Sequence, residues 1–132
     1  MPIDHIGLGV PDVDAAKAYY DEFMPLVGFV REWETGYRPV DWQGTQIMLY
    51  PTLEDGDYSR DRIGLQHISF YVPTRADVHR IYEWAKARGH EIVHDPKPFP
   101  EYHARFYATF FLDMHGFMLE IVTYENVEDA DV

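Results

Sequence analysis

Cysteine is absent from this sequence of 132 residues. A disulfide framework, a thiol nucleophile and a thiolate metal site are therefore all excluded. Basic residues are also few, because 11 Lys and Arg stand against 23 Asp and Glu and leave a formal net charge of −12. This balance argues against nucleic acid and against an anionic membrane surface as partners, since both require clustered positive charge.

A long apolar run and a signal-peptide pattern are missing as well, so we expect a cytoplasmic protein. Aromatic residues, by contrast, make up 16% of the chain, which excludes disorder over most of it. The length suits one domain with a substantial core.

Two stretches about half a chain apart resemble each other. In residues 5–11 and 67–73 a His, an Ile, a Val and a Pro recur in the same register, at an offset of 62 residues (67 − 5). This repeat predicts a duplicated module that carries a histidine in both copies.

Periodicity predicts the same order of elements in both halves, namely a strand, a helix and three more strands. In the first half, Asp12 is expected to cap a helix from Val13 to about Met24. The strands expected around this helix are residues 3–10, 29–34, 38–42 and 45–50.

In the second half, Thr74 is expected to cap the helix, and Asp77 completes a capping-box-like arrangement. The run from Pro96 to Pro100 is expected to be a loop, because proline interrupts a strand ladder. The strands expected around the helix are residues 66–72, 91–94, 106–113 and 117–123.

The sequence therefore predicts an α+β fold, in which two repeated βαβββ modules form a curved mixed sheet around a cavity. The single domain covers residues 1–132, with module one at about 1–50 and module two at about 63–124. Residues 51–62 are interpreted as a linker, and residues 125–132 as a loosely held acidic tail.

Strand phase selects three side chains for the cavity. Apolar residues that alternate with His5 and with His67 are expected to face the helices, so the two histidines point to the opposite, concave side. Glu120 of the last strand is expected to point the same way. Two imidazoles and one carboxylate match a facial triad that leaves metal positions open for substrate. One strand His or Glu is more commonly a surface residue, so the metal interpretation depends on all three together.

The repeat also identifies a fourth position. Aligning Gly44 with Gly116 makes Met48 the counterpart of Glu120. A thioether is a poor ligand for a hard divalent ion, so this corner is predicted to be water, substrate or apolar wall. Gln46 is the alternative oxygen donor nearby. The other histidines examined fall at turns, at strand ends or on the helix and are interpreted as surface residues: His79, His90, His94 and His115.

A substrate-binding wall is predicted from alternate strand positions. Its members are Met48, Tyr50, Tyr71 and Tyr107, with Trp33 and Trp42 nearby. The same pattern also suits an ordinary core. Arg105 is the candidate to pair with an anionic substrate in so acidic a chain.

At these residues the chain resembles the vicinal oxygen chelate superfamily, which groups glyoxalase I, extradiol dioxygenases, fosfomycin-resistance transferases and bleomycin-resistance proteins. The resemblance runs from His5-Ile6 through His67-Ile68 and Gly116 to Glu120. It implies one divalent metal ion (Fe, Ni, Zn, Co or Mn) at His5, His67 and Glu120, and a homodimer. His5 and His67 would meet either within one chain or across two subunits.

The branches of the superfamily imply different chemistry. Glyoxalase I carries a second metal-bound Glu where this sequence has Met48. The spacing of His103 and Glu120 resembles the extradiol dioxygenase signature, in which His103 would act as an acid or base, although Phe110 and Met114 depart from it. Bleomycin-resistance proteins lack the three metal ligands.

The function expected from this resemblance is that of a divalent-metal-dependent, glyoxalase-like lyase or isomerase. Its small oxygenated substrate would chelate the metal through neighbouring oxygens, with Glu120 as a catalytic residue. Two alternatives stay open: an extradiol-type ring-cleaving dioxygenase with Fe(II), and a metal-free protein that sequesters a small molecule.

Overall fold

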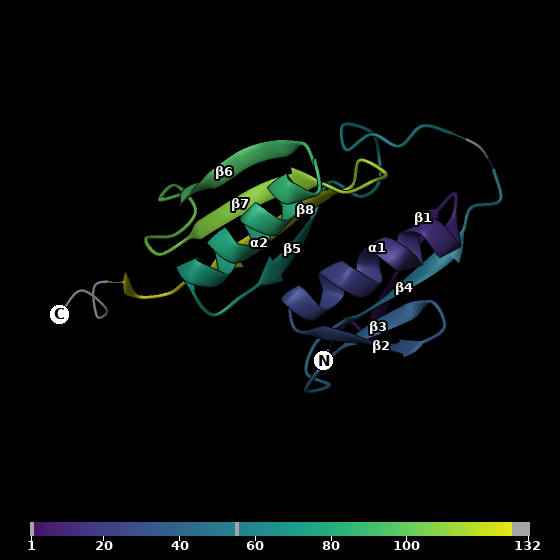
Figure 1. Ribbon diagram of the computed structural model, residues 1–132, viewed down its shortest axis with the longest axis horizontal. Coiled ribbons are helices and arrows are strands. Elements are labelled where there is room, and N and C mark those ends of the chain that lie inside the picture. The colour runs from purple at the N-terminus through teal and green to yellow at the C-terminus, as the bar shows by residue number, and fades with distance from the viewer. Residues whose placement is uncertain (1, 55, 128–132) are drawn as a thin grey trace. The chain divides into compact units, whose positions relative to one another are not determined.

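The computed structural model describes residues 2–54 and 56–127. The chain divides into two compact units, Met1–Asp57 and Tyr58–Val132, which we call unit 1 and unit 2. Each unit contains a strand, a helix and three more strands in that order (Figure 1). The predicted α+β class and the two βαβββ modules are therefore confirmed.

Unit 1 is a four-stranded sheet with one helix. Its strands lie in the order β1-β4-β3-β2, with β1 and β4 parallel and the other pairs antiparallel. The helix packs against the sheet with Ala16, Tyr20 and Phe23 buried, and the Asp12 carboxylate accepts a hydrogen bond of 3.1 Å from the Ala15 amide at its start. The elements are β1 (His5–Val10), α1 (Val13–Leu26), β2 (Phe29–Trp33), β3 (Gly36–Pro39) and β4 (Gln46–Pro51).

Unit 2 repeats this arrangement. Its strands lie in the order β5-β8-β7-β6, with β5 and β8 parallel. The elements are β5 (Ile68–Tyr71), α2 (Arg75–Ala87), β6 (Ile92–Pro98), β7 (Tyr107–Leu112) and β8 (Met118–Thr123). Helix α2 lies on one face of the sheet (Figure 1), where Val78, Ile81 and Ala85 are buried. No helix in the described part of the chain is long and apolar enough to cross a membrane.

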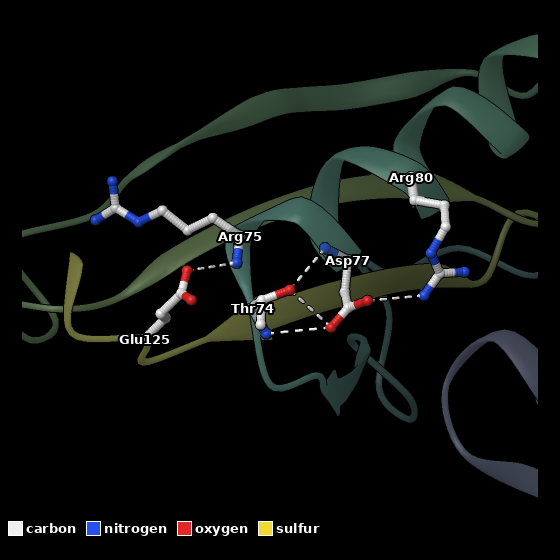
Figure 2. A network of polar contacts seen from close by, with 5 residues as sticks. All are labelled: Thr74, Arg75, Asp77, Arg80 and Glu125. Atoms are coloured by element: carbon white, nitrogen blue, oxygen red, sulfur yellow. Dashed lines mark hydrogen bonds and ion pairs between the residues drawn. The ribbon is translucent and has the colours of Figure 1, made fainter. Parts of the chain in front are cut away.

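The start of α2 is held by the network of polar contacts in Figure 2. The Thr74 hydroxyl accepts a hydrogen bond of 3.1 Å from the Asp77 amide, and the Asp77 carboxylate accepts one of 3.2 Å from the Thr74 amide. The predicted capping box is thus confirmed. Arg80, 3.0 Å from Asp77, holds the pKa of that carboxyl below its usual range, and the bonds from Thr74 act in the same direction.

The first residue of the predicted acidic tail is also part of this network. The Glu125 carboxylate accepts a hydrogen bond of 3.0 Å from the Arg75 amide (Figure 2). The tail is therefore anchored where it leaves β8. Residues 128–132 of the tail lie outside the described residues.

Strand β3 is shorter than its prediction and begins earlier. It ends at Pro39, whereas the sequence predicted a strand over residues 38–42. The Trp42 amide donates a hydrogen bond of 3.1 Å to the Pro39 carbonyl, and Trp42 has a φ of 63°. This left-handed backbone turns the chain where the aromatic and apolar residues had suggested a continued strand.

The prediction of a loop over Pro96 to Pro100 was wrong in part, because β6 continues through Pro96 and Pro98. β6 is the outer strand of its sheet and pairs with β7, with shifts of register between Ile92 and His94 and again between His94 and Lys97. A proline is tolerated in an edge strand because no further strand lies on its outer side, so its missing N–H costs no hydrogen bond there.

Candidate active site

A histidine and a carboxylate meet on one face of the unit 2 sheet. His67 directly precedes β5, and Glu120 pairs with Ser69 between β8 and β5. The His67 Nε2 lies 3.1 Å from the Glu120 Oε1. Leu119 and Ile121, on either side of Glu120, are fully buried on the face that packs against α2. The predicted phase of this strand is therefore confirmed.

Glu120 is unusual for a carboxylate because it is only 3% exposed. Within the described residues its Oε2 is buried and has no hydrogen-bond partner. Burial raises the pKa of Glu120, while the nearby His67 imidazole and the Ser69 hydroxyl act to lower it. An unsatisfied buried oxygen destabilises a fold by about 1–3 kcal/mol, a cost that a bound cation would offset.

The pair opens into a cavity of about 710 Å³ that is lined by unit 2 alone. This volume is within the range of sites for small molecules. Its apolar wall consists of Val93, Phe99, Tyr102, Phe106, Phe110 and Met118. Its polar groups, besides His67 and Glu120, are Arg60, Gln66, Ser69 and His94.

Much of the wall comes from the connection between β6 and β7. The Phe99 amide donates a hydrogen bond of 2.9 Å to the Phe106 carbonyl, which closes this connection into a loop. The Phe99 ring lies 5.6 Å from Phe110 and 5.9 Å from both Tyr102 and Phe106, measured between ring centroids. The loop thus covers part of the sheet with aromatic rings.

His94 is exposed, as its interpretation as a surface residue requires, but it also forms part of the cavity wall. Its ring lies 5.4 Å from Phe110 and 5.7 Å from Phe99, edge to face, and it lines the cavity. Because β6 runs on to Pro98, His94 is inside the strand instead of at its end. A strand prediction that allowed prolines at a sheet edge would have found it. Arg60 was also missed, and its segment has no periodicity that could have revealed it.

The predicted residues of unit 1 lie along two paired strands. His5 starts β1, and its Nδ1 lies 2.7 Å from the Asp4 carboxylate. Met48 pairs with Gly7, two residues after His5, just as Glu120 pairs with Ser69, two residues after His67. The registers of the two sheets therefore support the alignment of Met48 with Glu120.

The remaining inner positions of β1 and β4 are more open. Gln46, the alternative oxygen donor, pairs with His5. Tyr50, two residues after Met48 on β4, is 51% exposed. Both residues belong to unit 1, and the proposed roles of Met48 and Tyr50 in substrate binding stay predictions.

Three predicted residues of unit 2 are exposed and do not line this cavity. Tyr71 is 62% exposed on β5. In the loop before β7, the His103 Nδ1 accepts a hydrogen bond of 2.9 Å from the Arg105 amide, and the His103 ring lies 5.2 Å from that of Tyr124. The catalytic role of His103 and the binding roles of Tyr71 and Arg105 stay predictions.

Tyr107 lies on the other face of the sheet, so its predicted place in the inner wall needs correction. Its hydroxyl lies 2.6 Å from the His79 Nε2, and the Arg75 guanidinium lies 4.3 Å from the centre of its ring. Both partners belong to α2. Alternation along β7 places Phe110 at the cavity and Tyr107 against the helix. His79 is consequently a partner of Tyr107 and not simply a solvated residue.

The residues around the cavity fit a divalent cation. His67 offers an imidazole nitrogen, and Glu120 offers a carboxylate with one buried, open oxygen. These are ligand types that Zn²⁺, Fe²⁺, Mn²⁺, Co²⁺ and Ni²⁺ accept. Residues 2–54 and 56–127 contain no assembled group of three or more His, Asp or Glu that could hold a metal. His5 belongs to unit 1, and its assignment as a ligand stays a prediction.

Comparison with known proteins identifies the family of this chain. The sequence profile of the Glyoxalase/Bleomycin resistance protein/Dioxygenase superfamily matches residues 2–121. The chain is 28% identical over 127 residues to Uncharacterized protein YqjT of Bacillus subtilis (strain 168). The matched region covers 89% of this chain and 95% of that protein.

Solved structures show the same fold. A glyoxylase/bleomycin resistance protein/dioxygenase domain from Frankia sp. EAN1pec superposes with a TM-score of 0.70 at 23% identity, over 92% of this chain and 95% of that one. Lactoylglutathione lyase from Agrobacterium tumefaciens gives a TM-score of 0.64 at 20% identity, over 92% of each chain. The match to the family profile over most of the sequence establishes that the chain belongs to the Glyoxalase/Bleomycin resistance protein/Dioxygenase superfamily.

Proposed function

We propose that this protein is a divalent-metal-dependent, glyoxalase-like lyase or isomerase that acts on a small oxygenated molecule. The observation that carries the proposal is the state of Glu120, a buried carboxylate whose Oε2 has no partner within the described residues. It lies beside the His67 imidazole at a cavity of suitable size. Membership of the superfamily supports the same conclusion.

His67 and Glu120 would hold the cation, which when bound supplies a Lewis acid for neighbouring oxygens of the substrate. The His67 Nδ1 contacts the Gln66 side-chain oxygen, which fixes the ring so that Nε2 faces Glu120. Such an outer partner orients a ligating imidazole and raises its basicity.

Glu120 has a second role in the proposal. In the metal-free protein, burial disfavours the charged form of Glu120 and raises its pKa. Glu120 would accept a proton from a substrate carbon next to a carbonyl group and return it to the adjacent carbon. The rings of Phe99, Phe106 and Phe110 would keep water away while charge develops.

The test compares the metal content of purified protein with that of His67→Ala and Glu120→Gln. We expect about one metal ion per chain in the wild type and a loss of at least tenfold in affinity in both variants. His103→Ala is the matched control, because its ring lies in an exposed loop, and it should keep the metal. Equal and negligible metal in all four proteins would overturn the proposal and favour metal-free sequestration.

His5→Ala belongs in the same series because the family resemblance makes His5 a third ligand. We expect this variant to lose metal as His67→Ala does. The homodimer is a further part of the proposal, and light scattering on the purified protein measures it. A monomer that retains the metal would contradict the dimer while leaving the ligand assignment in place.

The aromatic wall favours a second candidate, an Fe(II)-dependent ring-cleaving dioxygenase. Four of the lining residues, Phe99, Tyr102, Phe106 and Phe110, have rings that suit a planar substrate. Oxygen uptake by the iron-loaded protein in the presence of a catechol would support this branch. Activity with Ni, Zn, Co or Mn and without oxygen would support the lyase branch.

A further inference from the structure

Arg60 is the arginine that lines the cavity of unit 2. Its side chain is half-buried and forms no hydrogen bond or ion pair within residues 2–54 and 56–127. Asp and Glu outnumber Lys and Arg by 23 to 11 in this chain. An arginine that has no carboxylate partner among the described residues is therefore notable, above all beside an apolar wall, where a cation is poorly solvated.

The segment that carries Arg60 is fixed to unit 2. The Tyr58 ring packs edge to face on Phe117, with centroids 4.6 Å apart, and its hydroxyl donates to the Leu65 carbonyl. Between these anchors the Arg62 amide donates a hydrogen bond of 3.2 Å to the Ser59 carbonyl, which closes a turn around Arg60. The guanidinium is thus carried by an ordered turn, which lowers the entropic cost of binding a ligand.

The cavity itself restricts the rest of the ligand. Phe99, Tyr102, Phe106 and Phe110 offer ring faces and edges, which suit a flat aromatic body. The acidic chain and the buried Glu120 would repel an anion unless a cation paired with it. A guanidinium binds a carboxylate through two parallel hydrogen bonds, so Arg60 supplies the group that such a ligand needs.

We propose that the cavity takes a small aromatic molecule with a carboxylate, and that Arg60 selects it by pairing with that anionic group. It differs from the prediction that Arg105 pairs with the anion, because Arg105 lies in an exposed loop and does not line this cavity. The proposal rests on the proposed function for the reaction that follows binding. Recognition of the carboxylate by Arg60 needs no metal, so the two proposals can be tested separately.

The experiment uses the chain of residues 1–132 treated with a chelator, so that no metal contributes to binding. Isothermal titration measures the affinity for naphthoate and for naphthalenemethanol, which share one ring system and differ in charge. We expect naphthoate to bind the wild type at least about tenfold more tightly, the range for a hydrogen bond to a charged group. Arg60→Gln should remove this preference and leave the affinity for naphthalenemethanol within about twofold.

Two further variants make the test specific. Arg60→Lys keeps the positive charge and should retain part of the preference for naphthoate, whereas Arg105→Gln should retain all of it. Equal losses in Arg60→Gln and Arg105→Gln would mean that only overall charge matters, and would overturn the proposal. Failure of the wild type to bind either compound would also overturn the proposal. An unchanged circular dichroism spectrum of Arg60→Gln would show that a loss of the preference for naphthoate is not caused by misfolding. An unchanged metal content would show that the metal proposal is not affected.

Discussion

Unit 1 and unit 2 repeat one fold and differ at the position beside the repeated histidine. In unit 2, Glu120 pairs with Ser69 and lies against His67. In unit 1, Met48 occupies the equivalent position. The histidine was retained in both copies, while the neighbouring residue is a carboxylate in one and a thioether in the other. The copies therefore share a framework, but only unit 2 has a carboxylate beside the histidine.

Space around Met48 explains how unit 1 accommodates the change. A Cβ atom added to Gly36 would lie 2.3 Å from the Met48 Sδ, and one added to Gly7 would lie 2.9 Å from the Tyr50 ring. Met48 and Tyr50 therefore occupy room that side chains at these glycines would need. Unit 2 has Ser69 at the place of Gly7, and its hydroxyl acts on Glu120 instead. In unit 1, glycines thus leave room for the bulky side chains of Met48 and Tyr50. In unit 2, the polar residue Ser69 lies beside the carboxylate of Glu120.

The largest effect is expected in the cores of the two units. Phe23 of unit 1 and Phe111 of unit 2 are both fully buried, each in the unit where a helix packs against a sheet. Phe23→Ala and Phe111→Ala should each lower the free energy of unfolding by about 3–5 kcal/mol, through lost burial and the cavity that remains. Denaturant titration measures this, and Leu53→Ala, at a position 96% exposed, is the control. If either substitution lowered the free energy of unfolding by less than about 1 kcal/mol, the core of that unit would not be organised as described.

The next test restores the missing carboxylate. Met48→Glu, made in a His67→Ala background, should raise the affinity for Zn²⁺ by about tenfold, or 1.4 kcal/mol, because the introduced carboxylate would lie beside His5 as Glu120 lies beside His67. Isothermal titration with Zn²⁺ provides the measurement. Met48→Gln has nearly the same size without the charge and should give no gain. An equal gain from both substitutions would break the equivalence of the two positions.

The two helix starts differ in their side-chain hydrogen bonds, of which the Thr74–Asp77 pair has three and Asp12 has one. Thr74 forms a capping box with Asp77, whereas the Asp12 side chain accepts a single bond from the Ala15 amide. Thr74→Ala should lower the free energy of unfolding by about 1 kcal/mol, and Asp12→Ala by about 0.5 kcal/mol. Thermal or chemical unfolding tests this order, with Thr74→Ser as a control that keeps the hydroxyl. A larger loss from Asp12→Ala would contradict it.

The smallest effect concerns pH. Arg80, followed by Thr74, holds the pKa of Asp77 below its usual range, so the folded state favours the charged carboxylate. The stability from this group is therefore complete at neutral pH and is lost as pH falls through its usual value of 3.8 and below. For so exposed a pair we expect about 0.5 kcal/mol or less. Asp77→Asn should flatten the fall in stability below about pH 5 relative to the wild type, and an unchanged slope would contradict the assignment.

Much of the fold could be predicted because each element leaves a local pattern. The alternation around Glu120 correctly gave its side of the sheet, and the spacing of Thr74 and Asp77 gave the capping box. The alignment of Met48 with Glu120 followed from the repeat and agrees with the strand registers. These features depend on residues close in sequence or on comparison of the two copies.

The rest of the site depends on how distant segments fold back. Neither periodicity nor the repeat reveals that the loop from Phe99 to Phe106 covers the sheet, or that the turn at Arg60 reaches the cavity. The face that Tyr107 occupies was mistaken because its partners, His79 and Arg75, come from a helix far away in sequence. Such contacts are set by tertiary packing, which a single strand pattern does not record.

The prolines of β6 have a consequence for association between molecules. β6 forms the outer edge of the unit 2 sheet, and Pro96 and Pro98 have no N–H to offer to a further strand. Lys97 between them adds a charge that an incoming strand would have to accommodate. This edge is therefore protected against the strand-by-strand growth that leads to aggregates. Any assembly of this chain that uses β6 must be made through side chains, because its backbone does not provide a continuous ladder.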